Sequence, residues 1–219
     1  MSSNSVVMLG ATGAVGQQVV KTLINMPLTR LTLLGRRELE GVTGHSVTQH
    51  LVDIHNPTSY QDFLIGHKTA ICTLGVGQPS KMSKSDFLKI DKDAVLKFAT
   101  ACKQAGIRHF ELLSSVGANS SSFSFYLRTK GELEDGLRAL NFELLSLFHP
   151  SMILTPTNRY GLSQQITLIT WPLLSPMFIG ALSKFRGINV DELGAAIAKN
   201  IITNKQGEEI LEWEQFTVQ

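Results

Sequence analysis

Hydrophobic and polar residues divide the chain into short apolar runs that alternate with amphipathic stretches. An apolar run without alternation is typical of a strand that is buried on both faces of a sheet. Such runs predict strands at residues 6–9, 31–34, 69–75, 108–113 and 140–148. Residues 51–54 predict the end of a third strand, and residues 208–218 predict a last strand. Helical spacing predicts helices at residues 17–24, 57–64, 83–105, 126–134 and 190–198. This alternation predicts an α/β fold, with a parallel sheet covered by helices on both faces.

Length and composition change this picture little. With 219 residues, of which 43% are hydrophobic, the chain is long enough for one well-buried domain. Its 20 basic and 18 acidic residues give a net charge of +2, too small to indicate a nucleic-acid surface. Cys72 and Cys102 lack metal-ligand spacing and predict reduced, buried thiols. The histidines show no metal-site pairing either, so we expect no metal.

Three glycines follow the first predicted strand. Gly10, Gly13 and Gly16 lie between that strand and the first helix, the context of a dinucleotide-binding turn. There they permit a tight turn, a close approach to a pyrophosphate, and close packing of helix on strand. The spacing is GxxGxxG rather than the commoner GxGxxG, and a purely structural turn is the alternative. The expected cofactor contacts in this turn are Gly10, Thr12, Gly13, Ala14, Val15 and Gly16.

The second predicted strand ends in a pair of arginines. A dinucleotide fold usually places an acidic residue about 20 residues after the glycines, where it binds the ribose 2′-hydroxyl. Arg36 and Arg37 stand there instead, and their forked guanidinium groups suit a 2′-phosphate by charge and by geometry. The pair favours NADP (NADPH) over NAD as the cofactor, with a solvated basic turn as the alternative.

Three further residues are candidates for the cofactor site. Asp53 lies at the predicted end of the third strand and is expected near the adenine, although a surface aspartate fits the same pattern. Leu74 and Gly75 close the fourth strand, where small residues let a cofactor ribose approach the backbone. Close packing alone is the alternative for this turn. The polar residues 81–86 form a loop that could cover the site.

A tyrosine and a lysine carry the candidate chemistry. Tyr126 and Lys130 have i and i+4 spacing, so a helix places them on one face, one turn apart. The unperturbed phenol pKa of about 10 is too high for ready proton transfer near neutrality, and a neighbouring ammonium lowers it. Ser114 or Ser115 follows the fifth strand, at the sheet edge where ligands bind in open α/β sheets. Either hydroxyl can hydrogen-bond a substrate oxygen.

Four segments of the chain carry a resemblance to a known family. They are GATGAVG (residues 10–16), LLGRR (33–37), ELLSSVGANSSSFSFYLRTKGELE (111–134) and HPSMILTP (149–156). With them the chain resembles the atypical NAD(P)H-binding branch of the short-chain dehydrogenase/reductase superfamily, and within it the HIV Tat-interacting oxidoreductase-like proteins. The resemblance extends to about residue 200. It implies a doubly wound parallel sheet, the Rossmann fold, that binds NADP.

The resemblance also implies how the site works. It assigns the superfamily's catalytic roles to Ser115, Tyr126 and Lys130, with Lys130 in contact with the nicotinamide ribose as well. The nicotinamide then supplies a hydride, and Tyr126 passes a proton to a carbonyl oxygen. The chain departs from its relatives at residues 149–151, where His-Pro-Ser replaces a frequent Arg-Pro-Gly. This loop borders the nicotinamide, with Pro150 as an expected cofactor contact. His149 is expected to be structural, with a catalytic role as the alternative.

We therefore expect a single domain over residues 1–219, with a dinucleotide-binding core at 1–150 and a small C-terminal lid or substrate section at 151–219. The expected activity is reduction of a small carbonyl substrate with NADPH. An NADPH-binding, redox-sensing protein with little turnover is the alternative. A nucleotide-sugar epimerase or dehydratase fits less well, because residues 151–219 are few for a substrate domain.

One strongly apolar segment, residues 166–182, bears on partners and location. It contains two prolines and is shorter than the roughly 20 apolar residues that a membrane span needs. We expect a hydrophobic lid or a homodimer surface there, with peripheral membrane contact as the alternative and no integral span. Because residues 1–4 leave no room for a signal peptide, a soluble, cytoplasmic protein is expected.

Overall fold

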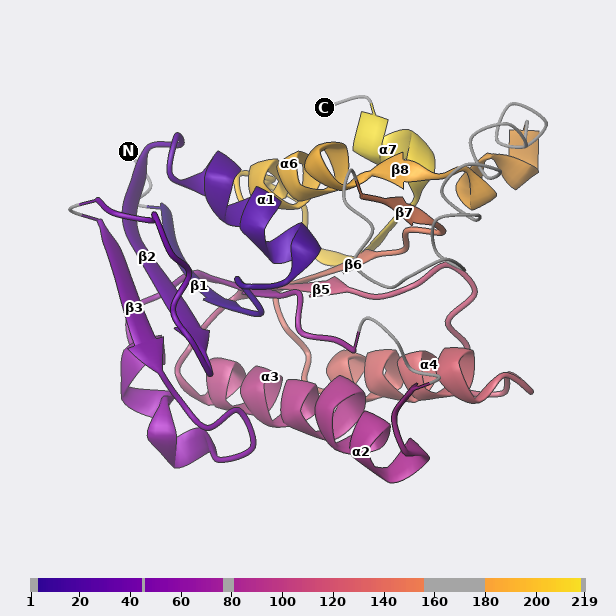
Figure 1. Ribbon diagram of the computed structural model, residues 1–219, viewed down its shortest axis with the longest axis horizontal. Coiled ribbons are helices and arrows are strands. Elements are labelled where there is room, and N and C mark those ends of the chain that lie inside the picture. The colour runs from indigo at the N-terminus through magenta and orange to yellow at the C-terminus, as the bar shows by residue number, and fades with distance from the viewer. Residues whose placement is uncertain (1–3, 45, 77–80, 156–179, 218–219) are drawn as a thin grey trace.

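Seven parallel strands of the described residues form the sheet, in the order β3-β2-β1-β4-β5-β6-β9 (Figure 1). The computed structural model describes residues 4–44, 46–76, 81–155 and 180–217. The strands are β1 (Asn4–Leu9), β2 (Leu28–Gly35), β3 (Val47–Leu51), β4 (Thr69–Cys72), β5 (His109–Leu113), β6 (Leu144–Phe148) and β9 (Gly207–Leu211). Since every neighbouring pair is parallel, all these strands end at the same edge of the sheet.

Helices cover both faces of this sheet (Figure 1). On one face lie α1 (Ala14–Leu23), α6 (Val190–Asn200) and α7 (Trp213–Thr217), and on the other α2 (Lys84–Leu88), α3 (Val95–Gln104) and α4 (Phe125–Arg138). Shorter elements are the 3-10 turns Pro57–Ser59, Gln61–Leu64 and Gly180–Phe185, and a ladder of β7 (Ile153–Leu154) with β8 (Ile188–Asn189). The predicted doubly wound α/β fold is confirmed.

The central strand β1 shows why its sequence lacks alternation. Val6 and Met8 pack into the hydrophobic cluster beneath α1 and α6, whereas Val7 and Leu9 pack into the cluster beneath α3. All four side chains are buried. A strand in the middle of a doubly covered sheet must be apolar on both faces, and burial of each such side chain contributes about 1.5–3 kcal/mol.

The structure corrects two predicted strands at the edges of the sheet. The third strand is predicted to end at residues 51–54, but β3 ends at Leu51 and begins at Val47. As an edge strand it has exposed or half-buried side chains, so the apolar run that marks central strands is missing. The last predicted strand, residues 208–218, is a strand only as far as Leu211. It ends where its partner β6 ends, and α7 follows.

Other predicted boundaries shift because local turns replace regular structure. The predicted strand 140–148 begins only at Leu144, since Asn141 has a positive φ of 51° in the turn after α4. The predicted helix 57–64 consists of two 3-10 turns. The Asn56 side chain caps the first of them by accepting a hydrogen bond from Thr58 N.

The helical predictions differ less from the structure. The first helix begins already at Ala14 rather than at residue 17, because it starts directly from the glycine turn. The predicted helix 83–105 is continuous from α2 to α3, with a π-helical turn, Lys89–Ala94, between them. The side chain of Ser83 caps it by accepting a hydrogen bond from Asp86 N at 3.1 Å.

The C-terminal part of the chain returns to the sheet. β9 extends the sheet beyond β6, and α6 packs closely on α1. At Gly194 in α6, an added Cβ would lie 2.4 Å from Cβ of Gln18, so only glycine permits this approach. Residues 156–179 lie outside the described residues, as does most of the apolar segment 166–182. A lid, a dimer surface and a membrane contact in this region therefore stay predictions.

A buried polar network joins β5, β6, β9 and α6. Asn200 Nδ2 donates to Ser146 Oγ at 3.0 Å and to Glu209 Oε1 at 2.9 Å, and it lies 3.3 Å from Glu111 Oε1. His109 Nε2 lies 2.8 Å from Ser146 Oγ. Burial raises the pKa of Glu111 well above its usual value. In the described structure its Oε2 has no hydrogen-bond partner, which fits a neutral carboxylic acid.

The substitution Glu111→Gln tests this protonation. A raised pKa in the folded state means that the folded protein keeps a proton that the unfolded chain releases, so stability falls as pH rises above the carboxyl's ordinary pKa of about 4.3. We expect E111Q to flatten this fall. At pH 8 its free energy of unfolding should exceed that of the wild type by at least about 1 kcal/mol. Urea unfolding at pH 5 and pH 8 measures it, with the exposed Glu40→Gln as control. Parallel pH curves for E111Q and the wild type would contradict the prediction.

Candidate functional site

The glycine turn connects β1 with α1 and packs tightly against the end of β4. Gly10 has a φ of +99°, and a Cβ there would lie 2.5 Å from Leu74 N, so this position requires glycine. A Cβ on Gly16 would lie 2.2 Å from the carbonyl oxygen of Gly10. Gly10 thus makes the turn, and Gly16 lets α1 begin directly against it, as the sequence predicts for these two glycines.

The first turn of α1 is open to an anion. Gly13 is the N-cap, and no side chain of the described residues caps the helix. The first turn holds no acidic residue that would compete for its N–H groups. Since these groups and the helix dipole favour negative charge, the turn formed by Gly13, Ala14 and Val15 fits a pyrophosphate.

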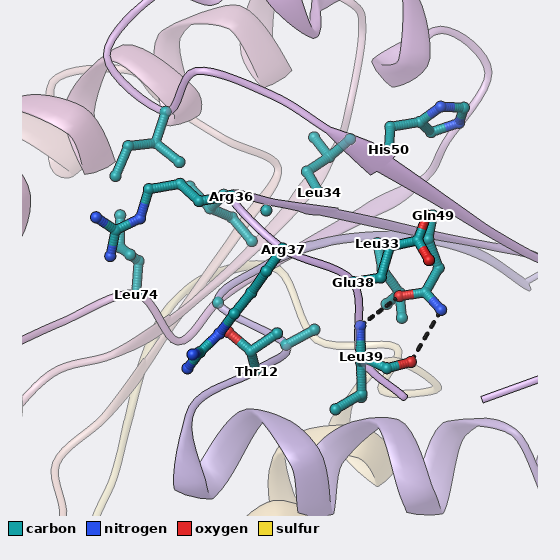
Figure 2. A pocket seen from close by; sticks show the side chains of 15 residues that line it. Thr12, Leu33, Leu34, Arg36, Arg37, Glu38, Leu39, Gln49, His50 and Leu74 are labelled. Carbon is teal, nitrogen blue, oxygen red and sulfur yellow. Dashed lines mark hydrogen bonds between the residues drawn. The ribbon is translucent and has the colours of Figure 1, made fainter. Parts of the chain in front are cut away.

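A pocket of about 300 Å³ opens beside this turn (Figure 2). Its walls come from the glycine turn, from the end of β2 with the loop that follows, from β3, and from the end of β4. The lining residues are Leu9, Gly10, Ala11, Thr12, Leu33, Leu34, Gly35, Arg36, Arg37, Glu38, Leu39, Gln49, His50, Ile54 and Leu74. The structure therefore brings the glycine turn and the arginine pair into one pocket at the carboxyl edge of the sheet, where open α/β sheets bind ligands.

Both arginines of this pocket are free to bind an anion. Arg36 and Arg37 are exposed, and neither forms an ion pair or a hydrogen bond with the described part of the chain. In Figure 2 their guanidinium groups lie away from Gln49 and His50, with Arg36 extending toward Leu74. Two unpaired guanidinium groups beside an open helix start suit a phosphate group.

The other predicted cofactor contacts lie at different distances from this pocket. Leu74 lines it, and Gly75 follows β4, which ends at Cys72 rather than at residue 75. Asp53 does not line it: its Oδ1 accepts a hydrogen bond from His55 N at 2.9 Å, and the neighbouring Ile54 forms the wall instead. A contact of Asp53 with an adenine thus stays a prediction.

Tyr126 and Lys130 lie one turn apart on α4. Lys130 Nζ is 6.0 Å from the centroid of the Tyr126 ring, and the Phe87 ring flanks that tyrosine at 5.9 Å between centroids. The Tyr126 hydroxyl has no hydrogen-bond partner among the described residues. α4 begins just before this tyrosine because the Ser124 side chain caps it by accepting from Leu127 N.

Lys130 has a buried partner that the sequence analysis missed. Its Nζ lies 3.0 Å from Asp91 Oδ1, and the two side chains are 4% and 2% exposed. Burial works against the lysine charge, but the Asp91 carboxylate outweighs it and raises the pKa of Lys130 above its usual value. Asp91 Oδ2 also accepts a hydrogen bond from Val76 N at 2.8 Å. This carboxylate therefore connects the lysine to the loop after β4.

The two serines after β5 differ in their contacts. Ser114 is buried, and its hydroxyl donates to Glu134 Oε1, the same oxygen that lies 2.8 Å from His149 Nε2. Ser115 is half-buried, and its hydroxyl makes only a 3.4 Å contact with the carbonyl oxygen of its neighbour. Ser115 is thus the serine with a hydroxyl available to a substrate, and His149 holds α4 against the ends of β5 and β6.

Pro150 is buried at the end of β6, where its carbonyl oxygen accepts a hydrogen bond from Val116 N at 3.0 Å. This bond ties the loop that carries Ser115 to the loop after β6. The structure thus places the predicted catalytic and cofactor residues along one edge of the sheet, although Ser115, Tyr126 and Lys130 do not line the pocket of Figure 2.

A signal for Asp91 is present in the sequence. Asp91 continues the apolar stripe of Phe87, Ala94 and Phe98 at helical spacing, and a carboxylate in such a stripe must find a buried partner. The sequence gives no comparable signal for the π-helical turn that carries Asp91. Such turns are frequent at functional sites.

Within the described ranges, no three His, Cys, Asp or Glu side chains are grouped so that they could hold a metal ion. No helix of those ranges has the length and apolar character that crossing a membrane requires. Cys72 and Cys102 are free and buried, and burial raises the pKa of both thiols.

Comparison with known sequences identifies relatives along most of the chain. A family model described as NAD(P)H-binding matches residues 10–165. Protein HTATIP2 of Rattus norvegicus is 38% identical over 157 residues, which are 70% of this chain and 64% of that protein. Protein FMP52 of Candida albicans, named as mitochondrial, is 30% identical over 175 residues, 76% of each chain. The alignment thus covers somewhat less than two thirds of HTATIP2.

Comparison with solved structures shows the same fold. MoeE5 in complex with UDP-glucose and NAD has a TM-score of 0.73 and 17% identity, over 95% of this chain and 75% of that one. UDP-N-acetylglucosamine 4-epimerase from Bacillus cereus has a TM-score of 0.66 and 14% identity, over 96% and 78%. At such low identity the likeness extends to the fold and not to the substrate.

Proposed function

The chain belongs to the NAD(P)H-binding family whose model matches residues 10–165, and from this premise we propose that it is an oxidoreductase that reduces a small carbonyl substrate with NADPH. The arrangement on α4 carries the proposal. Within the described residues the Tyr126 hydroxyl has no hydrogen-bond partner, and the ammonium of Lys130 one turn away is kept charged by buried Asp91. A phenolic hydroxyl beside a fixed cation is placed to donate a proton to a substrate oxygen.

The choice of NADPH rests on the pocket of Figure 2. Arg36 and Arg37 have no ion-pair partner there among the described residues, and they lie beside the glycine turn that would hold the pyrophosphate. A 2′-phosphate would give both guanidinium groups a partner, whereas the 2′-hydroxyl of NADH would leave them without one. Glu38, the residue after the arginine pair, has an exposed side chain.

The proposed mechanism assigns one task to each group. When bound, the dinucleotide supplies a hydride to the carbonyl carbon. The Tyr126 hydroxyl donates its proton to the carbonyl oxygen, and the Lys130 ammonium stabilises the phenolate that remains. The Ser115 hydroxyl donates a hydrogen bond to the same oxygen and orients it. Gly75 lies next to Lys130 and Asp91, and a Cβ there would be 3.3 Å from Asp91 Oδ1. Because glycine has no side chain, the backbone of the loop after β4 can approach a ribose at this position.

A second candidate is an NADPH-binding regulatory protein with little turnover. The loop at residues 149–151 favours it, because His149 is committed to Glu134. Location is a separate proposal. We keep the cytoplasm as the expected compartment, with the mitochondrion as the alternative suggested by the names of the FMP52 relatives.

The substitution Arg36→Ala tests the cofactor. We expect the wild-type protein to bind NADPH at least tenfold more tightly than NADH, because charge-assisted contacts to a phosphate contribute about 1.5–3 kcal/mol. R36A should lose most of this preference while it keeps its NADH affinity. Calorimetric titration with both nucleotides measures it, and the exposed Arg108→Ala, whose ion pair is with Glu143, is the matched control. Equal wild-type affinity for NADPH and NADH would contradict the choice of cofactor.

A further inference from the structure

The loop that carries the two arginines is fixed at both ends. On one side is Gly35, the last residue of β2, which belongs to the ladder with β3. On the other side is Leu39, which is held by the Gln49 side chain (Figure 2). Leu39 N donates to Gln49 Oε1 at 2.9 Å, and Gln49 Nε2 donates to the Leu39 carbonyl oxygen at 3.1 Å. Arg36 and Arg37 therefore lie on a short arc between two fixed points.

From this geometry we propose that Gln49 is a positioning residue that determines the preference for NADPH over NADH. The inference rests on the proposed function, because it assumes that the arginines bind the 2′-phosphate. Gln49 would act through the backbone of Leu39, by keeping the arginine arc in the conformation that receives the phosphate. Charge alone gives attraction, but a fixed arc avoids the entropic cost of ordering the loop on binding.

The side chain of Gln49 suits this task. A primary amide matches the donor and acceptor of one residue's backbone, and the two hydrogen bonds to Leu39 fix which end is oxygen and which is nitrogen. Gln49 lies on β3, opposite Leu33 of β2, so it projects from a paired strand. Leu39 is also fixed by its own side chain, which packs against the hydrophobic cluster beneath α1.

Removal of this anchor would leave Leu39 held by the packing of its side chain alone, so the backbone of the loop would be less restrained. Beyond Leu39 the chain is tied back to β2 at Ser46, whose carbonyl oxygen accepts a hydrogen bond from Leu31 N at 2.7 Å. Gly41, with a φ of +74°, lies within this stretch and permits many backbone conformations. A less restrained loop closes on the phosphate at a greater entropic cost, so a moderate loss of affinity is expected.

A direct contact between Gln49 and the cofactor is the competing explanation, since Gln49 lines the pocket. The part of the pocket that Gln49 and His50 line lies away from the guanidinium groups in Figure 2. A direct contact there would be with a part of the nucleotide that NADPH and NADH share. Its loss would weaken both cofactors alike, whereas loss of the loop anchor weakens NADPH selectively.

The test is Gln49→Met, which keeps the length of the side chain and removes both hydrogen bonds. We expect the NADPH dissociation constant to rise about fivefold or more and the NADH constant to change by less than about twofold. Amide hydrogen exchange of the unliganded protein should show faster exchange at Leu39. Gln49→Ala is the second variant, thermal melting reports folding, and Gln104→Ala at the exposed end of α3 is the matched control.

Each outcome decides between the two roles. Equal weakening of both cofactors, or an unchanged NADPH preference in Q49M, would overturn the role of Gln49 and leave the proposed function standing. In a background of Arg36→Ala and Arg37→Ala, Q49M should have no further effect on the NADPH constant, and an additional loss there would also overturn it. A wild-type protein without any NADPH preference would instead remove the proposed cofactor, and with it this inference.

Discussion

Tyr126→Phe is expected to abolish carbonyl reduction while NADPH binding persists. Phenylalanine keeps the ring that packs beside Phe87 and loses only the hydroxyl. General acid catalysis contributes about 10²–10⁴-fold to the rate, so turnover should fall by at least about a hundredfold. NADPH oxidation with a panel of small aldehydes and ketones identifies a substrate for the wild type and then measures the variant. Calorimetric titration should give an NADPH affinity within about twofold of the wild type.

Tyr60→Phe provides the matched control. Tyr60 is buried and is distant in sequence from α4. Its hydroxyl has no hydrogen-bond partner in the described structure. Its removal should therefore leave turnover unchanged. If Y126F reduced the same carbonyl as fast as the wild type, the assigned proton transfer would be wrong. If the wild type bound NADPH but reduced no member of the panel, the regulatory alternative would be favoured.

The parts of the fold that sequence predicts best are those with one dominant physical requirement. β1 must be apolar on both faces, and α1 must begin at glycines because any Cβ at Gly10 or Gly16 would overlap the backbone. Both requirements are local, so a short stretch of sequence expresses them. Tyr126 and Lys130 are likewise predictable as a pair, because helical spacing alone sets their relation.

The parts that sequence predicts poorly depend on tertiary position. β3 has a polar sequence because it lies at the sheet edge, and nothing within residues 42–50 indicates that a strand will add there. Gln49 belongs to this stretch, and its pairing with the Leu39 backbone depends on where the loop after β2 folds. A loop and an edge strand can have the same polar pattern in sequence. They differ in the folded protein, by the backbone groups that lie opposite them.

The face of α4 shows both situations in one helix. Tyr126, Lys130 and Glu134 follow one another at i+4 spacing, so sequence places all three on one face. Lys130 finds its partner, Asp91, outside this helix. Glu134 contacts Ser114 and His149 from outside it, and Arg138 of α4 at 3.3 Å. Spacing could not predict that Lys130 pairs with Asp91 rather than with Glu134, its neighbour on the helix. Burial decides this, because each charge needs its own partner once water is excluded.

Asp91→Asn is expected to have the largest effect on stability. Removal of one partner of a buried ion pair leaves the other charge uncompensated and costs about 3–5 kcal/mol. Without the carboxylate, burial lowers the pKa of Lys130, so the unfolded chain binds more protons than the folded one between that lowered value and about 10.4. The stability of D91N should therefore rise with pH relative to the wild type. Urea unfolding at pH 6 and pH 9 measures both effects.

A double variant separates the charge from the fold. Asp91→Asn with Lys130→Met removes both charges and fills the lysine's space with an apolar side chain, so most of the lost stability should return. Carbonyl reduction should not return, because the Lys130 ammonium that stabilises the Tyr126 phenolate is absent. D91N as stable as the wild type at pH 6 would mean that water or another group compensates Lys130. Recovery of turnover in the double variant would mean that the lysine charge has no part in the proton transfer.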